Sequence, residues 1–286
     1  MTPSLLRPTE ITATEFRAIS EFLHQRTGIR LAPGKETLVV GRLDKRLRNL
    51  GLRTYTDYLQ VLRSPQHAAE TRQAIDLLTT NETFFFREPR HFEFLGQVIA
   101  PEHLADRAAN RVGNRPFRLW SAASSSGEEA YSAAMVLAET LPNTPWEVVG
   151  TDISSRVVAG AEAGLYPISA AEKIPTPLLR RYCRKGRAEY EGLMAVDQAL
   201  RARTTFLGAN LLEDLSRLGR FDVILLRNVM IYFETATKVE VIGRLQEMLH
   251  PGGYLIVSLS ETLNGIPSRL RAVQPSIYRL TGAGVG

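Results

Sequence analysis

The sequence predicts an α/β fold in which a doubly wound, mainly parallel sheet follows an all-α domain and carries a small inserted lobe. Residues 10–80 have apolar positions at three- and four-residue spacing and no lasting strand pattern, which predicts helices joined by short turns. From about residue 116, short apolar strands alternate with helical segments, the order of a sheet covered by helices on both faces. We therefore expect a helical domain over 1–80, a linker over 81–115 and a sheet domain over 116–286.

In the helical domain, one helix is expected from about Lys35 to Leu50. The apolar stripe that we expect to face a core consists of Val39, Leu43, Leu47 and Leu50. The basic residues on a different face are Arg42, Lys45, Arg46 and, just beyond the helix, Arg53. Because Asp44 is the only acid within 42–48, pairing along the helix should not neutralise this basic face, although helical charges usually form a solvated face. We interpret the basic face as a docking surface for an acidic partner.

The sheet domain is read from alternating apolar segments and turns. Its expected elements, in chain order, are the strand FRLWSAA, a helix through Met135 and Leu137, the strand WEVVGTD, a helix near 155–163, a strand near 203–208, the strand FDVILLR, a helix over 235–249, and the strand YLIVSLS after the turn Pro251-Gly252-Gly253. The stretch from about 165 to 202 is too long for an ordinary connection, so we expect an inserted lobe there, with its β-subdomain at about 178–202.

Composition excludes several kinds of protein. No apolar stretch approaches the ~18 residues that span a bilayer, and MTPSLLRPTEIT lacks the layout of a secretion signal, so we expect a cytoplasmic protein without membrane insertion. The single Cys183 excludes an internal disulfide and a cysteine-based zinc site, and the five histidines are scattered, so we expect no metal. The net charge of +5 favours an acidic partner, which composition leaves open between nucleic acid, an anionic membrane surface and a protein.

Residues 221–233, FDVILLRNVMIYF, indicate a binding site because a buried-strand run ends abruptly in Arg227, Asn228 and Tyr232. Ligands of open α/β sheets sit beyond the carboxyl ends of the parallel strands, where these polar residues are expected. A polar strand-to-helix loop without a ligand is the alternative.

The segment LWSAASSSGEEAYSAAMVLAE reads as a strand, a turn of small residues, and a helix that begins near Gly127. Small side chains allow the backbone to approach a ligand closely. The segment is not a phosphate loop, because it lacks the Walker lysine and the G-x-G-x-x-G pattern, and because two carboxylates at a helix start would repel pyrophosphate. Glu128 and Glu129 could bind an ammonium group, or one of them could cap the helix.

About 30 residues after Ser121, Asp152 ends the second strand in VVGTDIS, where a carboxylate can accept hydrogen bonds from both hydroxyls of a ribose. Capping of the next helix is the alternative role. An acid at this place, with a small-residue turn, favours a nucleoside that carries an amino acid, and S-adenosylmethionine fits. The segment LLTTNETFFFREPRHF, with Asn81, Thr83 and Arg87, is expected to line the same cleft, although Phe84–Phe86 could instead form interdomain core.

Five ordered motifs, TTNETFFFREPRHF, WSAASSSGEEAYS, GTDIS, GANLL and FDVILLRNVMIYF, resemble those of the CheR family of chemotaxis receptor methyltransferases over nearly the whole chain. The resemblance implies a Rossmann-like domain that transfers methyl groups from S-adenosylmethionine to glutamate side chains on the cytoplasmic helical bundle of chemoreceptors. It implies cofactor contacts from Asn81, Thr83, Arg87, Glu129, Asp152, Asn210, Leu211, Asn228 and Val229. It also places Arg87 and Tyr232 nearest the transferred methyl group and makes the basic helical face the receptor-docking surface. We expect a monomer.

Two departures from the family pattern concern small residues. Ser124-Ser125-Ser126 and Ala130 replace residues that the family usually has around the GEE motif, and all are small enough to keep the close backbone approach. Some members carry closely spaced glycines in the β-subdomain and bind a pentapeptide at the receptor C-terminus. This chain has Gly186 and Gly192 with Ala188 between them, which leaves tethering to such a pentapeptide open.

Two rival functions remain. A nucleic-acid methyltransferase would fit the pI near 9.5, but Asn228 is followed by Val-Met-Ile instead of the Pro-Pro-aromatic sequence of amino-methylating enzymes, so we expect no nucleic-acid partner. A catalytically silent cofactor sensor or receptor scaffold would bind the cofactor without forming an ester, and the presence of both Arg87 and Tyr232 argues against it. In the expected reaction the substrate carboxylate is already ionised, so Arg87 would steer it and Tyr232 would orient it or the methyl group, without a general base.

Overall fold

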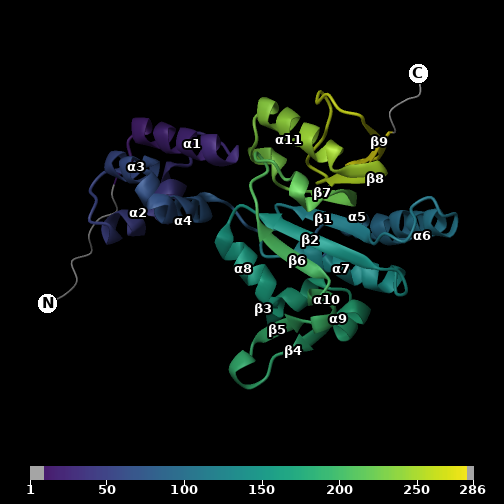
Figure 1. Cartoon of the computed structure of the whole chain (residues 1–286). Helices are drawn as coiled ribbons and strands as arrows, with labels where there is room; N and C mark the ends of the chain where they lie inside the picture. Colours follow the sequence, from purple (N-terminus) through teal and green to yellow (C-terminus); the bar gives the residue numbers. More distant parts are fainter. Residues whose placement is uncertain (1–9, 282–286) are drawn as a thin grey trace. The chain divides into compact units, whose positions relative to one another are not determined.

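The computed structural model of the chain describes residues 10–281 (Figure 1). The expectation of no secretion signal falls largely on residues 1–9, which lie outside the described residues, as do residues 282–286 at the end of the expected sheet domain. The described chain forms two compact units, one of residues 10–80 with Tyr232–Glu234 and one of residues 81–231 with 235–281. Within the described residues, no helix is both long and apolar enough to cross a bilayer.

The first unit is helical. It contains α1 (Ala13–Thr27), α2 (Glu36–Asn49), α3 (Tyr55–Arg63), the 3-10 turn η1 (Pro65–His67) and α4 (Ala68–Leu78). Thr12 and Glu15 form a reciprocal capping box that satisfies free backbone N–H groups at the start of α1. Val39, Leu43 and Leu47 of α2 are fully buried in its core, as the stripe predicts. The prediction for Leu50 was wrong: it is 40% exposed because α2 ends at Asn49.

A short segment from late in the chain also belongs to this unit. Phe233 forms a β-bridge with Ile29, and the backbone N–H of Arg30 donates to the carbonyl of Tyr232 at 3.0 Å. Glu234 is ion-paired with Arg30. Tyr232 is therefore held by the helical unit, although it follows the strand FDVILL closely in sequence.

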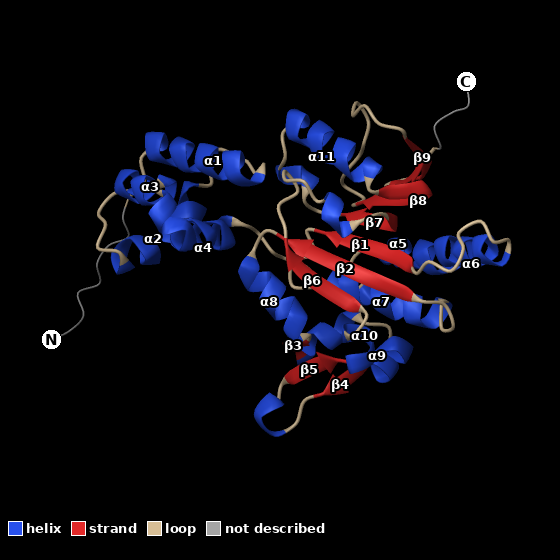
Figure 2. Cartoon of the chain, viewed as in Figure 1, coloured by secondary structure: helices blue, strands red, loops and turns tan. Residues whose placement is uncertain are grey.

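The second unit is built on a seven-stranded sheet with the order β6-β2-β1-β7-β8-β10-β9. All of these strands except β10 are labelled in Figure 2. The parallel strands are β1 (Phe117–Ala122), β2 (Trp146–Asp152), β6 (Thr204–Gly208), β7 (Phe221–Leu226) and β8 (Leu249–Val257). Two antiparallel strands, β9 (Leu270–Gln274) and β10 (Ile277–Leu280), complete one edge and are absent from the sequence-based expectation. The connecting helices are α7 (Glu128–Thr140), α8 (Ser155–Ala163) and α11 (Thr235–Glu247). The predicted α/β fold class is confirmed.

Strand order places a crevice at one position along the sheet. The chain runs from β1 to β2 and β6 in one direction, and from β7 to β8 in the other. The order therefore reverses between β1 and β7, and in doubly wound sheets ligands bind beyond the carboxyl ends of the strands at such a point.

Residues 81–115, expected to form a linker, fold as part of the second unit. They contain α5 (Pro89–Phe94), the π-helical turn η2 (Leu95–Ile99) and α6 (Ala100–Ala108), all of which contact α7. Phe85 and Phe86 are buried in the core of this unit, while Phe84 is 39% exposed. Two of the three aromatic side chains thus serve packing.

The inserted lobe is a three-stranded sheet with the order β3-β5-β4. Its elements are β3 (Leu165–Pro167), η3 (Ile168–Lys173), α9 (Thr176–Tyr182), β4 (Cys183–Lys185), η4 (Ala188–Tyr190), β5 (Leu193–Val196) and α10 (Gln198–Arg201). At Gly186 an added Cβ would lie 2.0 Å from the carbonyl oxygen of Tyr190, so only glycine fits. Ala188 has a φ of 53°, a conformation that a glycine would adopt without strain.

Candidate active site

The turn between β1 and α7 holds unusual backbone conformations at the carboxyl end of the sheet. Ala123 and Ser125 have φ values of 64° and 51°, and Gly127 has a φ of 93°. An added Cβ at Gly127 would come within 2.8 Å of the Cβ of Ala161, so the turn requires glycine for space as well as conformation. Non-glycine residues with positive φ cost free energy and concentrate at functional sites, which makes this turn a candidate for ligand binding.

The two glutamates after this turn have different surroundings. Glu129 lies buried, with one carboxylate oxygen accepting from the hydroxyl of Ser121 at 2.7 Å and the other from Arg227 at 2.7 Å. Because Ser121 is on β1 and Arg227 follows β7, this carboxylate lies where the strand order reverses. Glu128 accepts instead from the hydroxyl of Ser126 at 2.7 Å, and burial raises its pKa.

Asp152 joins two loops at the end of β2. One carboxylate oxygen accepts from the backbone N–H of Ser125 and the other from that of Ser154, both at 2.9 Å. Asp152 thus orders the loops around the β1–α7 turn.

The segment leading out of the helical unit lies against the same turn. The hydroxyl of Ser125 donates to the carbonyl of Asn81 at 2.8 Å, and the N–H of Phe86 donates to Ser132 of α7 at 2.9 Å. Thr83 and Arg87 are half-buried. The guanidinium of Arg87 donates to the carbonyl of Glu82 at 3.1 Å. The structure thus brings the backbone of two predicted cofactor residues to this region, with Asn81 against the β1–α7 turn and Arg87 against Arg227.

The remaining predicted cofactor residues follow β6 and β7. Asn210 accepts from the N–H of Leu212 at 3.1 Å, and Leu211 is half-buried beside it. Asn228 has a φ of 59° and donates its N–H to Glu261 at 3.0 Å, and Val229 is half-buried next to it. Sequence reasoning missed Glu261, although a signal existed: it stands where the apolar run YLIVSLS stops.

The predicted docking residues in the helical unit divide into two kinds. Arg42 donates to the carbonyls of Leu78 and Thr79, and burial lowers its pKa. Arg46 forms an ion pair with Glu70 at 2.5 Å, so the expectation of an un-neutralised basic face was wrong at this position. The acid lies two helices away, where helical spacing alone could not reveal it. The docking residues whose side chains are exposed are Lys45 and Arg53.

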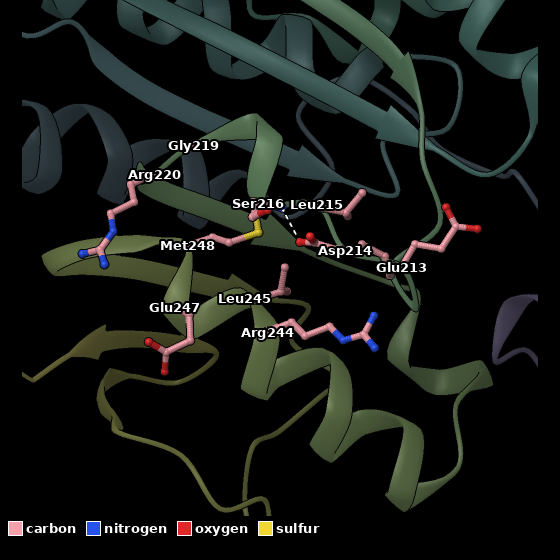
Figure 3. A pocket seen from close by; sticks show the side chains of 11 residues that line it. Glu213, Asp214, Leu215, Ser216, Gly219, Arg220, Arg244, Leu245, Glu247 and Met248 are labelled. Carbon is pink, nitrogen blue, oxygen red and sulfur yellow. Dashed lines mark hydrogen bonds between the residues drawn. The ribbon is translucent and has the colours of Figure 1, made fainter.

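A cavity of about 450 Å³ lies between the β6–β7 connection and the end of α11, and Figure 3 shows the side chains that line it. The connection from β6 to β7 has only the 3-10 turn η5 (Ser216–Leu218), so the end of α11 is left with space beside it. Leu215, Leu245 and Met248 form apolar parts of its wall. It shares only Leu211 with the predicted cofactor residues and is therefore not the predicted site. Among the described residues, no cluster of three metal-ligating side chains occurs.

Comparison with known proteins identifies the family. The model described as the CheR methyltransferase SAM-binding domain matches residues 81–278, and that of the CheR methyltransferase all-alpha domain matches residues 14–79. The chemotaxis protein methyltransferase of Escherichia coli (strain K12) is 40% identical, covering 98% of this chain and 96% of that protein. Chemotaxis protein methyltransferase 2 of Pseudomonas aeruginosa is 38% identical, covering 93% of each.

Solved structures add only a weak likeness. The glycopeptide N-methyltransferase MtfA complexed with S-adenosylmethionine is 18% identical, with a TM-score of 0.32 over 65% of this chain and 64% of that one, which is too low to bear on the assignment. The family models and the relatives instead cover nearly the whole chain. The protein therefore belongs to the CheR family and is an S-adenosylmethionine-dependent methyltransferase of chemotaxis.

Proposed function

We propose that the protein transfers a methyl group from S-adenosylmethionine to glutamate carboxylates on the cytoplasmic helical bundle of chemoreceptors, forming methyl esters. The observation that carries this proposal is the pair of buried carboxylates Glu129, in the first turn of α7 after β1, and Asp152, at the end of the adjacent strand β2. Glu129 accepts from the guanidinium of Arg227 and the hydroxyl of Ser121. Asp152 accepts from two backbone N–H groups in the neighbouring loops.

The chemistry of this donor set fits the cofactor. A buried carboxylate can bind the ammonium group of the methionine part, and a carboxylate at the position of Asp152 can accept hydrogen bonds from ribose hydroxyls. The divergence of Glu128 toward Ser126 supports Glu129 as the residue that meets the ammonium group. Asn81, Thr83, Asn210, Leu211, Asn228 and Val229 remain predicted contacts.

Bound S-adenosylmethionine supplies an electrophilic methyl group, and the receptor glutamate is ionised at neutral pH. The protein therefore needs no general base, and its contribution is alignment and exclusion of water, which can lower the barrier by about 7–11 kcal/mol. We assign steering of the carboxylate to Arg87 and its orientation to Tyr232. An ion pair that is too strong would stabilise the reactant, because the carboxylate loses its charge as the ester forms, so Arg87 should contact it obliquely.

The receptor surface that carries the methylation sites is acidic, and we assign its docking to the helical unit. Lys45 and Arg53 have exposed cationic side chains, while Arg42 and Arg46 are held by contacts within the unit. Exposed cations at an interface speed association more than they add affinity. A pentapeptide tether through the inserted lobe stays open, with Ala188 in place of a glycine.

The decisive experiment incubates the full chain with radiolabelled S-adenosylmethionine and purified receptor cytoplasmic fragments. Label released as methanol by mild base identifies a carboxyl ester, and Arg87→Ala should lose most of this rate while still binding the cofactor. Base-stable label, or label in added nucleic acid, would identify another substrate class. Cofactor binding without any transfer would identify a silent sensor or scaffold.

A further inference from the structure

Arg227 is a buried cation that the proposed reaction leaves without a role. Its side chain is 1% exposed and follows β7. One terminal nitrogen donates to Glu129 at 2.7 Å, and the other donates to Glu88 at 3.0 Å and to the carbonyl of Arg87. The guanidinium carbon lies 5.5 Å from the centre of the Phe92 ring. A charge this deeply buried is retained only at a high desolvation cost, so its partners indicate its purpose.

The charges around Arg227 do not cancel. The guanidinium carries +1, and Glu88 and Glu129 each carry −1, so the three groups leave a net charge of −1. His91 lies 3.3 Å from Glu88, but burial and the nearby Arg227 lower its pKa to about 4, which keeps it neutral at pH 7. Further ionisable groups close to these residues include Arg87 beside Glu88, Glu128, which accepts from Ser126, and Glu261, which accepts from backbone N–H groups.

We infer that Arg227 is a positioning residue for the cofactor: it fixes the carboxylate of Glu129 and cancels one of the two negative charges of Glu88 and Glu129, leaving one for the ligand's ammonium group. This inference rests on the proposed function, because it takes Glu129 as the ammonium-binding residue. The same guanidinium also binds the carbonyl of Arg87, so it joins the cofactor's amino acid end to the segment assigned to the substrate. Because Glu88 is a second carboxylate at this place, the position requires an arginine, whose two terminal nitrogens can each donate to one carboxylate.

The test compares two ligands in Arg227→Met. S-adenosylhomocysteine has the ammonium group, and 5′-methylthioadenosine shares the nucleoside but lacks the amino acid. By calorimetry at pH 6.5, the variant should bind S-adenosylhomocysteine at least about tenfold more weakly, because a charge-assisted contact loses its geometry, and 5′-methylthioadenosine within about threefold of the native protein. Equal losses for both ligands would mean a general structural role and would overturn the inference.

A pH profile provides a second readout. Without Arg227, Glu88 and Glu129 should share a proton, since two neighbouring negative charges raise one carboxyl pKa. Ammonium binding must displace that proton, so affinity should rise with pH between about 6 and 8 in Arg227→Met and stay flatter in the native protein. Adding Glu88→Gln leaves a single carboxylate and should restore the flat profile. If the affinity rose with pH as steeply in the double variant as in Arg227→Met, the charge balance would be refuted.

Arg227→Lys covers the case in which the methionine variant does not fold, as judged by circular dichroism. It keeps the buried charge, but one ammonium group cannot hold Glu129, Glu88 and the Arg87 carbonyl together. It should lose at least about fivefold in S-adenosylhomocysteine affinity with 5′-methylthioadenosine unchanged, and equal losses would again overturn the inference. Failure of the proposed function itself would look different, because the native protein would then show no preference for the ligand with the ammonium group.

Discussion

Reversing the charge of the two exposed docking residues, in the double variant Lys45→Glu/Arg53→Glu, should slow receptor methylation and leave the fold and cofactor binding intact. Both side chains are exposed on the helical unit, in contrast to Arg42 and Arg46. Among the described residues these two side chains form no recorded hydrogen bond or ion pair that reversal would break, so the effect should come from association with an acidic surface.

The magnitude follows from the charge change. Each reversal changes the charge by two units, so the pair changes it by four. A unit charge about 10 Å from a partner carboxylate interacts with it by about 0.4 kcal/mol in water, which gives about 1.7 kcal/mol for four units and roughly a 15-fold lower kcat/KM at low salt. At 0.1 M salt, one Debye length of screening reduces this to about 0.6 kcal/mol and roughly threefold.

The assay measures initial rates of base-labile methyl transfer to a receptor fragment at several salt concentrations, with S-adenosylhomocysteine affinity measured in parallel. Arg63→Glu/Arg72→Glu is the matched control, because both residues are exposed on the same unit but lie outside the predicted basic face. An unchanged rate at low salt in the docking variant would mean that the receptor docks on another surface of the protein. Equal slowing in the control would mean that overall charge, and not this face, guides the receptor.

Three further predictions test the site and the core. Asp152→Asn should weaken the binding of S-adenosylhomocysteine about 10- to 150-fold in calorimetry, since one charge-assisted hydrogen bond of about 1.5–3 kcal/mol is lost. A change in affinity below threefold would contradict the assignment of Asp152 to the ribose. Gly150→Ala should lower Tm because the new Cβ would lie 2.5 Å from the Phe206 ring, an overpacking cost of about 1–3 kcal/mol that Phe206→Leu should relieve; an unchanged Tm would refute this. Burial acts to raise the pKa of Glu70, but hydrogen bonds from Arg46 and Tyr58 outweigh it and hold the pKa below 4.5. The urea midpoint of the native protein should therefore exceed that of Glu70→Gln above about pH 4.5, and the difference should shrink as the pH falls further and Glu70 protonates; a constant difference would contradict it.

Sequence patterns predicted the parallel strands because each is a short apolar run bounded by turn residues. They did not predict β9 and β10, for which the physical reason is visible in RLRAVQPSIYRL. Charged residues interrupt the apolar alternation, and the register shifts between Ile277 and Tyr278. Such strands are defined by their pairing with β8 more than by their own composition.

The candidate site was predictable where it depends on strand ends and not where it depends on pairing across the chain. Asp152 and Glu129 follow predicted strands, and the rule for doubly wound sheets places both near a ligand. Arg227 also stood out as a polar residue at a strand end, but its partner Glu88 is 139 residues earlier. Nothing in local periodicity encodes such a pair, and the same holds for Arg46 with Glu70.

The motif FDVILLRNVMIYF illustrates how a continuous sequence signal can serve two units. Its first part is β7, and Asn228 after it donates to Glu261 within the sheet unit. Its last residues are held by the helical unit through Arg30 and the bridge from Phe233 to Ile29. Because Tyr232 is thus fixed by helical-unit contacts, loosening that unit should disturb the residue that we assign to orienting the substrate while sparing cofactor affinity. Arg30→Ala, which removes an ion pair to Glu234, should therefore lower kcat more than it changes S-adenosylhomocysteine binding, and parallel losses in both would refute this division of roles.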